Sequence, residues 1–303
     1  MVFAPSPLIT VTIEDRGGEA DLHVHAGGQG VWQARMISSL GVPVVLCAAL
    51  GGENGEILRH LIAAEGVDLD AEKVGTRNGG YVHDRRGGER RSIAEVPGGA
   101  LDRHELDGLY ERTLTRGLAA SIALLSGPHD DRIVPASVYR RLTTDLSANG
   151  CRVVGDLSGQ QLGAMLEGSP FLIKVSHQEL VRDGRVSSES PTELVDAMHQ
   201  LRKDGAEAVV VSRAAQPALA LVDDEVLEVR MPPLEPADPR GAGDSMTAGL
   251  AAFLARGESM QSALRIGAAC GALNVVRCGL GTGGTAVAAL AKRVELCRWA
   301  RDG

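Results

Sequence analysis

The sequence predicts an α/β fold, in which a doubly wound, mostly parallel sheet carries helices on both faces and a small β-sheet stands beside it. Short apolar runs alternate with helical patterns along most of the 303 residues, which is typical of parallel strands joined by crossover helices. Several of the runs, such as residues 42–52 and 208–212, are continuously apolar, as expected for strands covered on both sides. One polar stretch, residues 73–97, breaks this rhythm and predicts the smaller sheet.

The first third of the chain predicts two strand–helix units. Residues 8–14 alternate β-branched and polar side chains, as a half-buried strand does. The glycine-rich segment 26–30 leads into a helical pattern over 31–41 that Gly41 closes. A buried strand over 42–52 and a helix over 56–65, ended by Gly66, complete the second unit.

The polar stretch predicts a hairpin with its turn at residues 86–89, around two adjacent glycines. We interpret this stretch as a small β excursion from the α/β pattern. The α/β rhythm then resumes within what we interpret as one domain spanning residues 1–303. We expect helices at 104–117, 135–149 and 191–205, strands at 121–126, 152–157, 171–174, 208–212, 218–222 and 226–230, and two or three helices after residue 243.

Composition excludes several classes of function. The net charge of −8 and the 8 aromatic residues argue against a nucleic-acid partner. The five cysteines are scattered without a Cys-x-x-Cys pair, so neither a disulfide framework nor a structural zinc site is expected. A signal peptide and a membrane-spanning run are also lacking, so we expect a cytoplasmic protein with no membrane partner.

The strongest functional signal is the glycine turn of Gly241, Ala242 and Gly243, followed by Asp244 at the start of a predicted helix. Small residues let backbone N–H groups approach a ligand closely, and the first N–H groups of a helix favour a phosphate or an oxyanion. Asp244 is therefore either a simple N-cap residue or a general base that holds a hydroxyl beside the anion site.

This turn, preceded by Asp238, resembles the signature of the ribokinase-like (PfkB) carbohydrate kinases. Further segments occur in the order that this family shows, and the chain looks closest to the phosphofructokinase and tagatose-6-phosphate kinase branch. The matching segments are residues 26–41, 76–101, 124–139, 156–180 and 208–221.

The resemblance implies that the small sheet is a lid, with strands in residues 8–26 and 73–97. It also implies a kinase that transfers the γ-phosphoryl group of ATP to a hydroxyl of a sugar or sugar phosphate bound under this lid. It assigns general-base catalysis to Asp244 and the anion hole to the amides of residues 241–243. Glu179 matches the family's residue for Mg²⁺. The positions that match the nucleotide side are Lys174, Ser176, Ser212, Arg240 and Gly281; those that match the sugar side are Thr10, Gly27, Gly28, Gln29, Trp32, Arg77 and Ser126.

The sequence departs from the family pattern mainly at the acceptor. Thr10 stands where the branch has a sugar-binding Asp, Gln29 replaces a Lys, and Trp32 replaces an Asn. On the nucleotide side, Pro239 replaces a Thr and Ser176 an Asn. The glycine turn and Asp244 are retained, so the pattern favours a kinase with an unusual acceptor.

Two alternatives stay open. The departures are also compatible with a catalytically impaired protein that senses a sugar or a nucleotide. Trp32 offers a flat face for a nucleoside base, which would make the chain a nucleoside kinase of the same fold. The lid should expose strand edges and an apolar face, so we also expect a homodimer formed through the lid.

Overall fold

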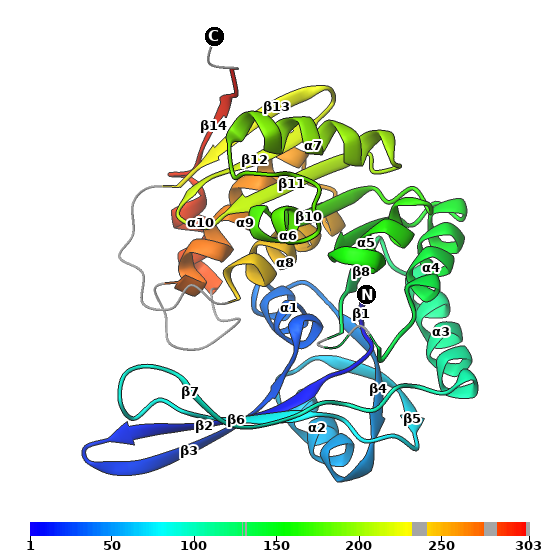
Figure 1. Ribbon diagram of the computed structural model, residues 1–303, viewed down its shortest axis with the longest axis vertical. Helices are drawn as coiled ribbons and strands as arrows, with labels where there is room; N and C mark the ends of the chain where they lie inside the picture. The colour runs from blue at the N-terminus through cyan, green and yellow to red at the C-terminus, as the bar shows by residue number, and fades with distance from the viewer. Residues whose placement is uncertain (129, 131, 232–240, 276–283, 301–303) are drawn as a thin grey trace.

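The computed structural model describes residues 1–303 except 129, 131, 232–240, 276–283 and 301–303. Within these residues, a ten-stranded sheet lies between two layers of helices, and a four-stranded sheet projects from one end of the molecule as the lid (Figure 1). Both sheets and the two-sided helix cover agree with the fold class that the sequence predicts.

The large sheet is parallel through its centre and antiparallel at one end. Its order is β14-β13-β12-β11-β10-β9-β8-β1-β4-β5, and the strands from β11 to β5 run parallel. The strands, in this order, are Glu295–Arg298, Glu225–Arg230, Gln216–Val222, Ala208–Arg213, Leu172–Ser176, Arg152–Asp156, Ile122–Ser126, Val2–Ala4, Val45–Gly51 and Asp68–Val74.

Each face of this sheet carries its own buried apolar cluster. Alternate residues of one strand join opposite clusters: Val154 packs on one side and Val153 on the other, which explains the continuously apolar strands. The first face is covered by α1 (Gln29–Ser39), α2 (Gly52–Ala64), α8 (Ala242–Ala255), α9 (Met260–Val275) and α10 (Gly284–Ala291). The second is covered by α3 (Arg103–Leu118), α4 (Ala136–Ala148), α5 (Gly159–Leu166), α6 (His177–Arg182) and α7 (Pro191–Lys203).

The lid consists of β2 (Leu8–Arg16), β3 (Glu19–Gly27), β6 (Gly80–Asp84) and β7 (Arg91–Val96), in the order β3-β2-β6-β7. Its base is tied to the large sheet by Asn78, a buried side chain whose amide donates to the carbonyls of Pro7 and Ala49 and accepts from the N–H of Gly51. Gly28, with φ of 102°, joins β3 to α1. The lid therefore continues directly into the helix that covers the large sheet.

Three strands escaped the sequence analysis. β1 has three residues beside two prolines, β14 has four, and β5 carries alternating charged and half-buried side chains in an edge position. Residues 73 and 74, which we assigned to the lid, end β5 instead. No helix among the described residues combines the length and the apolar character that crossing a bilayer requires.

Candidate active site

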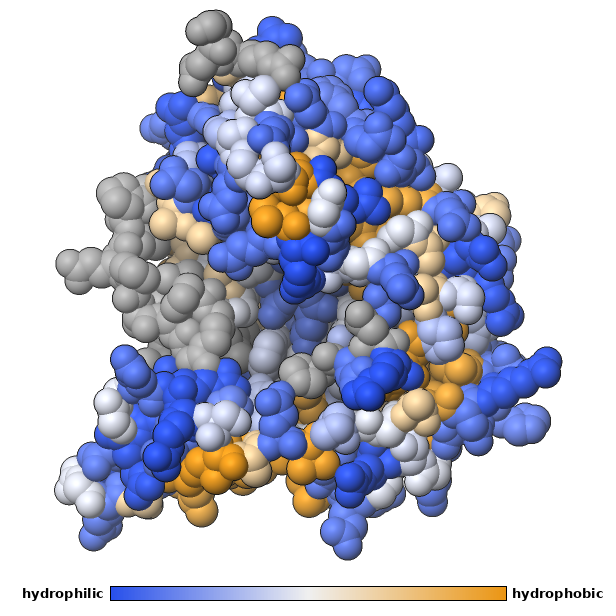
Figure 2. Space-filling model, viewed as in Figure 1, coloured by the Kyte–Doolittle hydropathy of each residue, from blue (hydrophilic) through white to orange (hydrophobic). Residues whose placement is uncertain are grey.

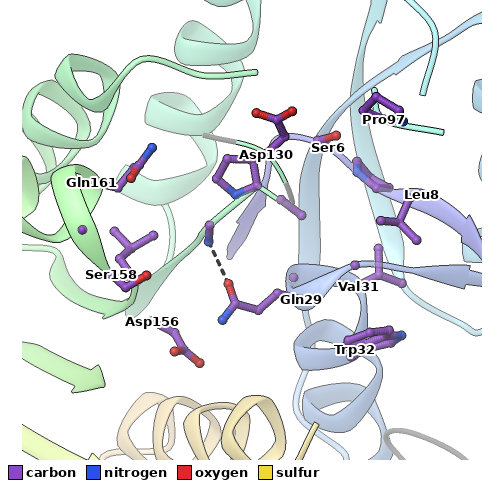
Figure 3. A pocket seen from close by; sticks show the side chains of 18 of the residues that line it. Ser6, Leu8, Gln29, Val31, Trp32, Pro97, Asp130, Asp156, Ser158 and Gln161 are labelled. Atoms are coloured by element: carbon purple, nitrogen blue, oxygen red, sulfur yellow. Dashed lines mark hydrogen bonds between the residues drawn. The ribbon is translucent and has the colours of Figure 1, made fainter. Parts of the chain in front are cut away.

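A cavity of about 800 Å³ lies between the lid and the carboxyl ends of the parallel strands. Its wall on the sheet side includes Gly127 after β8, Asp156 at the end of β9 and Glu179 beyond β10, while Leu8 and Tyr81 line it from the lid. Figure 3 shows Asp156 and Gln29 on the lower wall, with α8 running beneath them. Ligands of open α/β sheets bind at this edge, so the cavity is the candidate active site.

The glycine turn adopts the geometry of an anion-binding helix start. Gly241 is the N-cap of α8, with a left-handed φ of 69° that favours glycine, and no side chain of the described residues caps this helix. The N–H groups of Ala242 and Gly243 thus begin α8 without a capping side chain. Asp244 occupies the third helical position, so the N-cap interpretation of this residue is wrong.

Lys174 approaches the same turn from β10. A Cβ atom added to Gly243 would lie 2.6 Å from its Nζ, so any side chain at this position would displace the ammonium group. Nζ donates to Oδ1 of Asp156 at 3.0 Å, and both side chains are buried. Burial alone would lower the pKa of Lys174, but the charges of Asp156 and Asp244 raise it above its ordinary value. Lys174 thus remains a cation beside the turn.

The surroundings of Asp244 bring the pKa of its carboxyl group close to neutrality. Burial, reinforced by the charge of Asp156, raises the pKa of Asp244 to about 7, against the opposing effects of Lys174 and of a hydrogen bond from Gln29. Gln29 is held in place for this role, because its Oε1 accepts a hydrogen bond of 2.8 Å from the N–H of Gly127 (Figure 3). A carboxyl group with this pKa can accept a proton from an alcohol at physiological pH.

Glu179 and Ser176 form a capping box at the start of α6. The Ser176 hydroxyl and N–H donate to Oε2 of Glu179 at 2.8 and 2.7 Å, while Ser176 Oγ accepts from the Glu179 N–H. Glu179 still lines the cavity. Ser212 pairs with Ser176 across β10 and β11, and its carbonyl lies 3.1 Å from Nδ1 of His177. Arg240 and Gly281 lie outside the described residues.

On the acceptor side the structure divides the predicted residues. Gly28, Gln29 and Trp32 line the cavity. Ser126 is fully buried and donates its hydroxyl to Gln33.

Thr10, Gly27 and Arg77 are not among the residues that line the cavity. Thr10 Oγ1 is buried against Gly27 and has no hydrogen-bond partner in the part of the chain that the structure describes, while Arg77 is exposed at the base of the lid. Leu8, two residues before Thr10, lines the cavity instead.

Sequence analysis missed several polar groups of this site. Asp156 was placed at a strand end without a role, and Gln33 and Thr247, which both donate to it, were read as ordinary helical residues. The signal available was polarity at positions where α1 and α8 should face the core. Among the described residues, no three His, Cys, Asp or Glu side chains converge as a metal site.

Comparisons with known proteins agree with this geometry. The profile of the pfkB family carbohydrate kinases matches residues 11–285. The ATP-dependent 6-phosphofructokinase isozyme 2 of Escherichia coli is 32% identical over 252 residues, which cover 81% of this chain and 80% of that protein.

Solved structures share the fold. Phosphofructokinase-2 from Escherichia coli, in complex with fructose-6-phosphate, superimposes with a TM-score of 0.82 at 26% identity, covering 96% of this chain and 97% of that one. Arabidopsis thaliana ribokinase, complexed with ribose and ATP, has a TM-score of 0.75 at 22% identity over 96% and 98% of the two chains, a likeness of fold alone. With the glycine turn, the poised carboxyl group and the lid in place, the chain belongs to the pfkB family of carbohydrate kinases.

Proposed function

We propose that the chain transfers the γ-phosphoryl group of ATP to a hydroxyl of a sugar or sugar phosphate bound between the lid and the large sheet. The observation that carries this proposal is the placement of one carboxyl group, with a pKa near 7, next to a buried ammonium group and a helix start of the anion-binding type. Phosphoryl transfer depends mainly on positioning and on charge stabilisation, which these groups provide.

In the proposed mechanism, Asp244 accepts the proton of the acceptor hydroxyl as its oxygen attacks the γ-phosphorus. The bond from that phosphorus to the β,γ-bridging oxygen breaks, and ADP leaves. The N–H groups of Ala242 and Gly243 stabilise the charge of the migrating group, and Lys174 adds a positive charge beside Gly243. Gln29 keeps the carboxylate of Asp244 oriented during the transfer.

Glu179 is the residue that we propose for Mg²⁺. Kinase magnesium is held mainly by substrate phosphates and water, with one or two carboxylates of the protein. Glu179 lines the cavity and uses Oε2 for the capping box, which fits such a role through bound water. The metal would neutralise phosphate charge when bound.

A sugar phosphate is the favoured acceptor, because the relatives are named 6-phosphofructokinase and 1-phosphofructokinase. Arg182 lines the cavity and could pair with a phosphate. A nucleoside is the second candidate. Trp32 and Tyr81 both line the main cavity and a smaller one of about 360 Å³, so both aromatic residues border space in which a planar base could stack.

The test is an ADP-release assay with Mg-ATP and a panel of sugars, sugar phosphates and nucleosides, comparing the wild type with Asp244→Asn. We expect turnover of at least one acceptor and a decrease in kcat of roughly 10²–10⁴-fold in the variant. Ligand-induced thermal stabilisation without ADP release from any acceptor would contradict the proposal and favour a non-catalytic sensor.

We also propose a homodimer through the lid. Leu22 and Val24 of β3 and Ile93 of β7 are exposed, and Figure 2 shows apolar side chains gathered along the lower edge of the lid. A second copy would cover this surface. Light scattering of the Leu22→Glu variant should give the mass of a monomer. Leu118 is an exposed leucine on α3, outside the lid, so Leu118→Glu should leave the dimer intact. A wild-type protein that is monomeric at micromolar concentration would contradict the proposal.

A further inference from the structure

Gln33 is a polar side chain enclosed in the apolar layer between α1 and the large sheet. It is 0% exposed and does not line the cavity. Both ends of its amide are nevertheless used: Nε2 donates to Oδ2 of Asp156 at 3.0 Å, and Oε1 accepts the hydroxyl of Ser126. An apolar residue would fill this place without the cost of burying an amide, so the hydrogen bonds call for an explanation.

Asp156 accepts hydrogen bonds from three side chains, of which Gln33 is one. Besides Gln33, it accepts from Lys174 Nζ at Oδ1, 3.0 Å away, and from Thr247 Oγ1 at Oδ2, 2.7 Å away. The three donors come from α1, β10 and α8. One carboxylate thus joins three elements that meet below the cavity.

Two of these donors are parts of the phosphoryl-transfer centre or adjoin it. Lys174 Nζ lies 2.6 Å from the position that a Cβ of Gly243 would take, and Thr247 Oγ1 also lies 3.0 Å from the carbonyl oxygen of Gly243. Any rotation of the Asp156 carboxylate would therefore change the position of the ammonium group relative to the glycine turn. Gln33 opposes that rotation, because Ser126 fixes its amide and the amide fixes Oδ2.

We propose that Gln33 is a positioning residue for phosphoryl transfer, acting through Asp156 on Lys174 and on the first turn of α8. The inference rests on the proposed kinase function of the same site. Gln33 does not line the cavity, so we expect its effect on the rate of transfer and not on binding of the acceptor.

The test begins with Gln33→Met, which keeps the length of the side chain and removes both hydrogen bonds. We expect kcat to fall roughly 10–100-fold, because displacements below 1 Å at a transfer centre have effects of this size, while KM for the acceptor stays within about twofold. Thr113→Val is the matched control: its hydroxyl is fully buried and donates to the carbonyl of Leu109 within α3, so the change should affect stability alone.

A double-mutant cycle separates positioning from a merely structural role. If Gln33 acts through Asp156, then Gln33→Met should reduce kcat no further in an Asp156→Asn background. Full additivity of the two changes, or an unchanged kcat in folded Gln33→Met, would overturn the inference. Gln33→Glu has a side chain of equal size, places a second carboxyl group against Asp156, and serves as the test if the methionine variant does not fold. At pH 8 its kcat should be at least tenfold below that of the wild type. A wild-type kcat in this variant would overturn the inference.

The wild-type assay distinguishes this failure from that of the proposed function. A wild type that releases no ADP with any acceptor overturns the kinase proposal, and the inference with it. If the wild type is active and the Gln33 variants have the same kcat as the wild type, only the inference is overturned.

Discussion

Gly243→Ala tests the geometry of the transfer centre most directly. The added Cβ would stand 2.6 Å from Lys174 Nζ, whereas ordinary contacts begin at 3.4 Å, so the ammonium group has to retreat by about 0.8 Å. Its bond of 3.0 Å to Asp156 leaves it little freedom to do so without breaking the pair. A displacement of this size costs on the order of 10²-fold in kcat, which corresponds to about 2.7 kcal/mol in the activation free energy.

The assay is kcat in the ADP-release reaction, with the melting temperature measured in parallel. Gly163→Ala is the matched control, since Gly163 lies in α5 and a Cβ there meets nothing within 4 Å. Alanine in that helix should stabilise the fold by about 0.5–1 kcal/mol and leave kcat unchanged. Folded Gly243→Ala with kcat within twofold of the wild type would refute the role given to Lys174.

Three further predictions concern the acid–base and metal chemistry. Gln29→Met removes a hydrogen bond that lowers the pKa of Asp244, so the acid limb of the kcat/KM profile should move to higher pH; an unmoved limb would separate Gln29 from the base. In the wild type the pKa of Asp244 rises from 3.8 to about 7 on folding, so the free energy of unfolding should fall as pH rises through this interval. Asp244→Asn should therefore melt at a higher temperature than the wild type at pH 8 but not at pH 4. Equal melting temperatures at pH 8 would contradict the raised pKa. Glu179→Gln keeps the capping box but loses the charge, so the Mg²⁺ concentration for half-maximal rate should increase, and an unchanged requirement would remove Glu179 from the metal site.

The sequence predicted the alternating elements because strands buried on both faces leave an unmistakable apolar run. It failed at β5, an edge strand that carries Asp68, Asp70 and Glu72, and at β14, which among the described residues pairs with β13 alone. Such strands depend on partners that are distant in the sequence, and local pattern contains little of that information.

The site was predictable where backbone conformation dictates residue type. Position 241 needs a left-handed φ, and position 243 lies close to the ammonium group of Lys174, so both favour glycine. The two glycines in the sequence therefore indicated this turn. Gln33 gave no such signal, and the match to the family assigned Ser126 to the sugar side, because the hydrogen bond between these two residues joins positions 93 apart in the sequence. Leu8 lines the cavity, whereas Thr10, which the match to the family assigned to the sugar side, does not.

The junction at Gly28 has a mechanical consequence. β3, which ends at Gly27, belongs to the lid over the cavity. α1, which begins at Gln29, carries the side-chain amide that is hydrogen-bonded to Asp244. Only Gly28 separates them, so a movement of the lid would also displace the start of α1. Closure of the lid over an acceptor would then change the position of Gln29 relative to Asp244, the base that we propose.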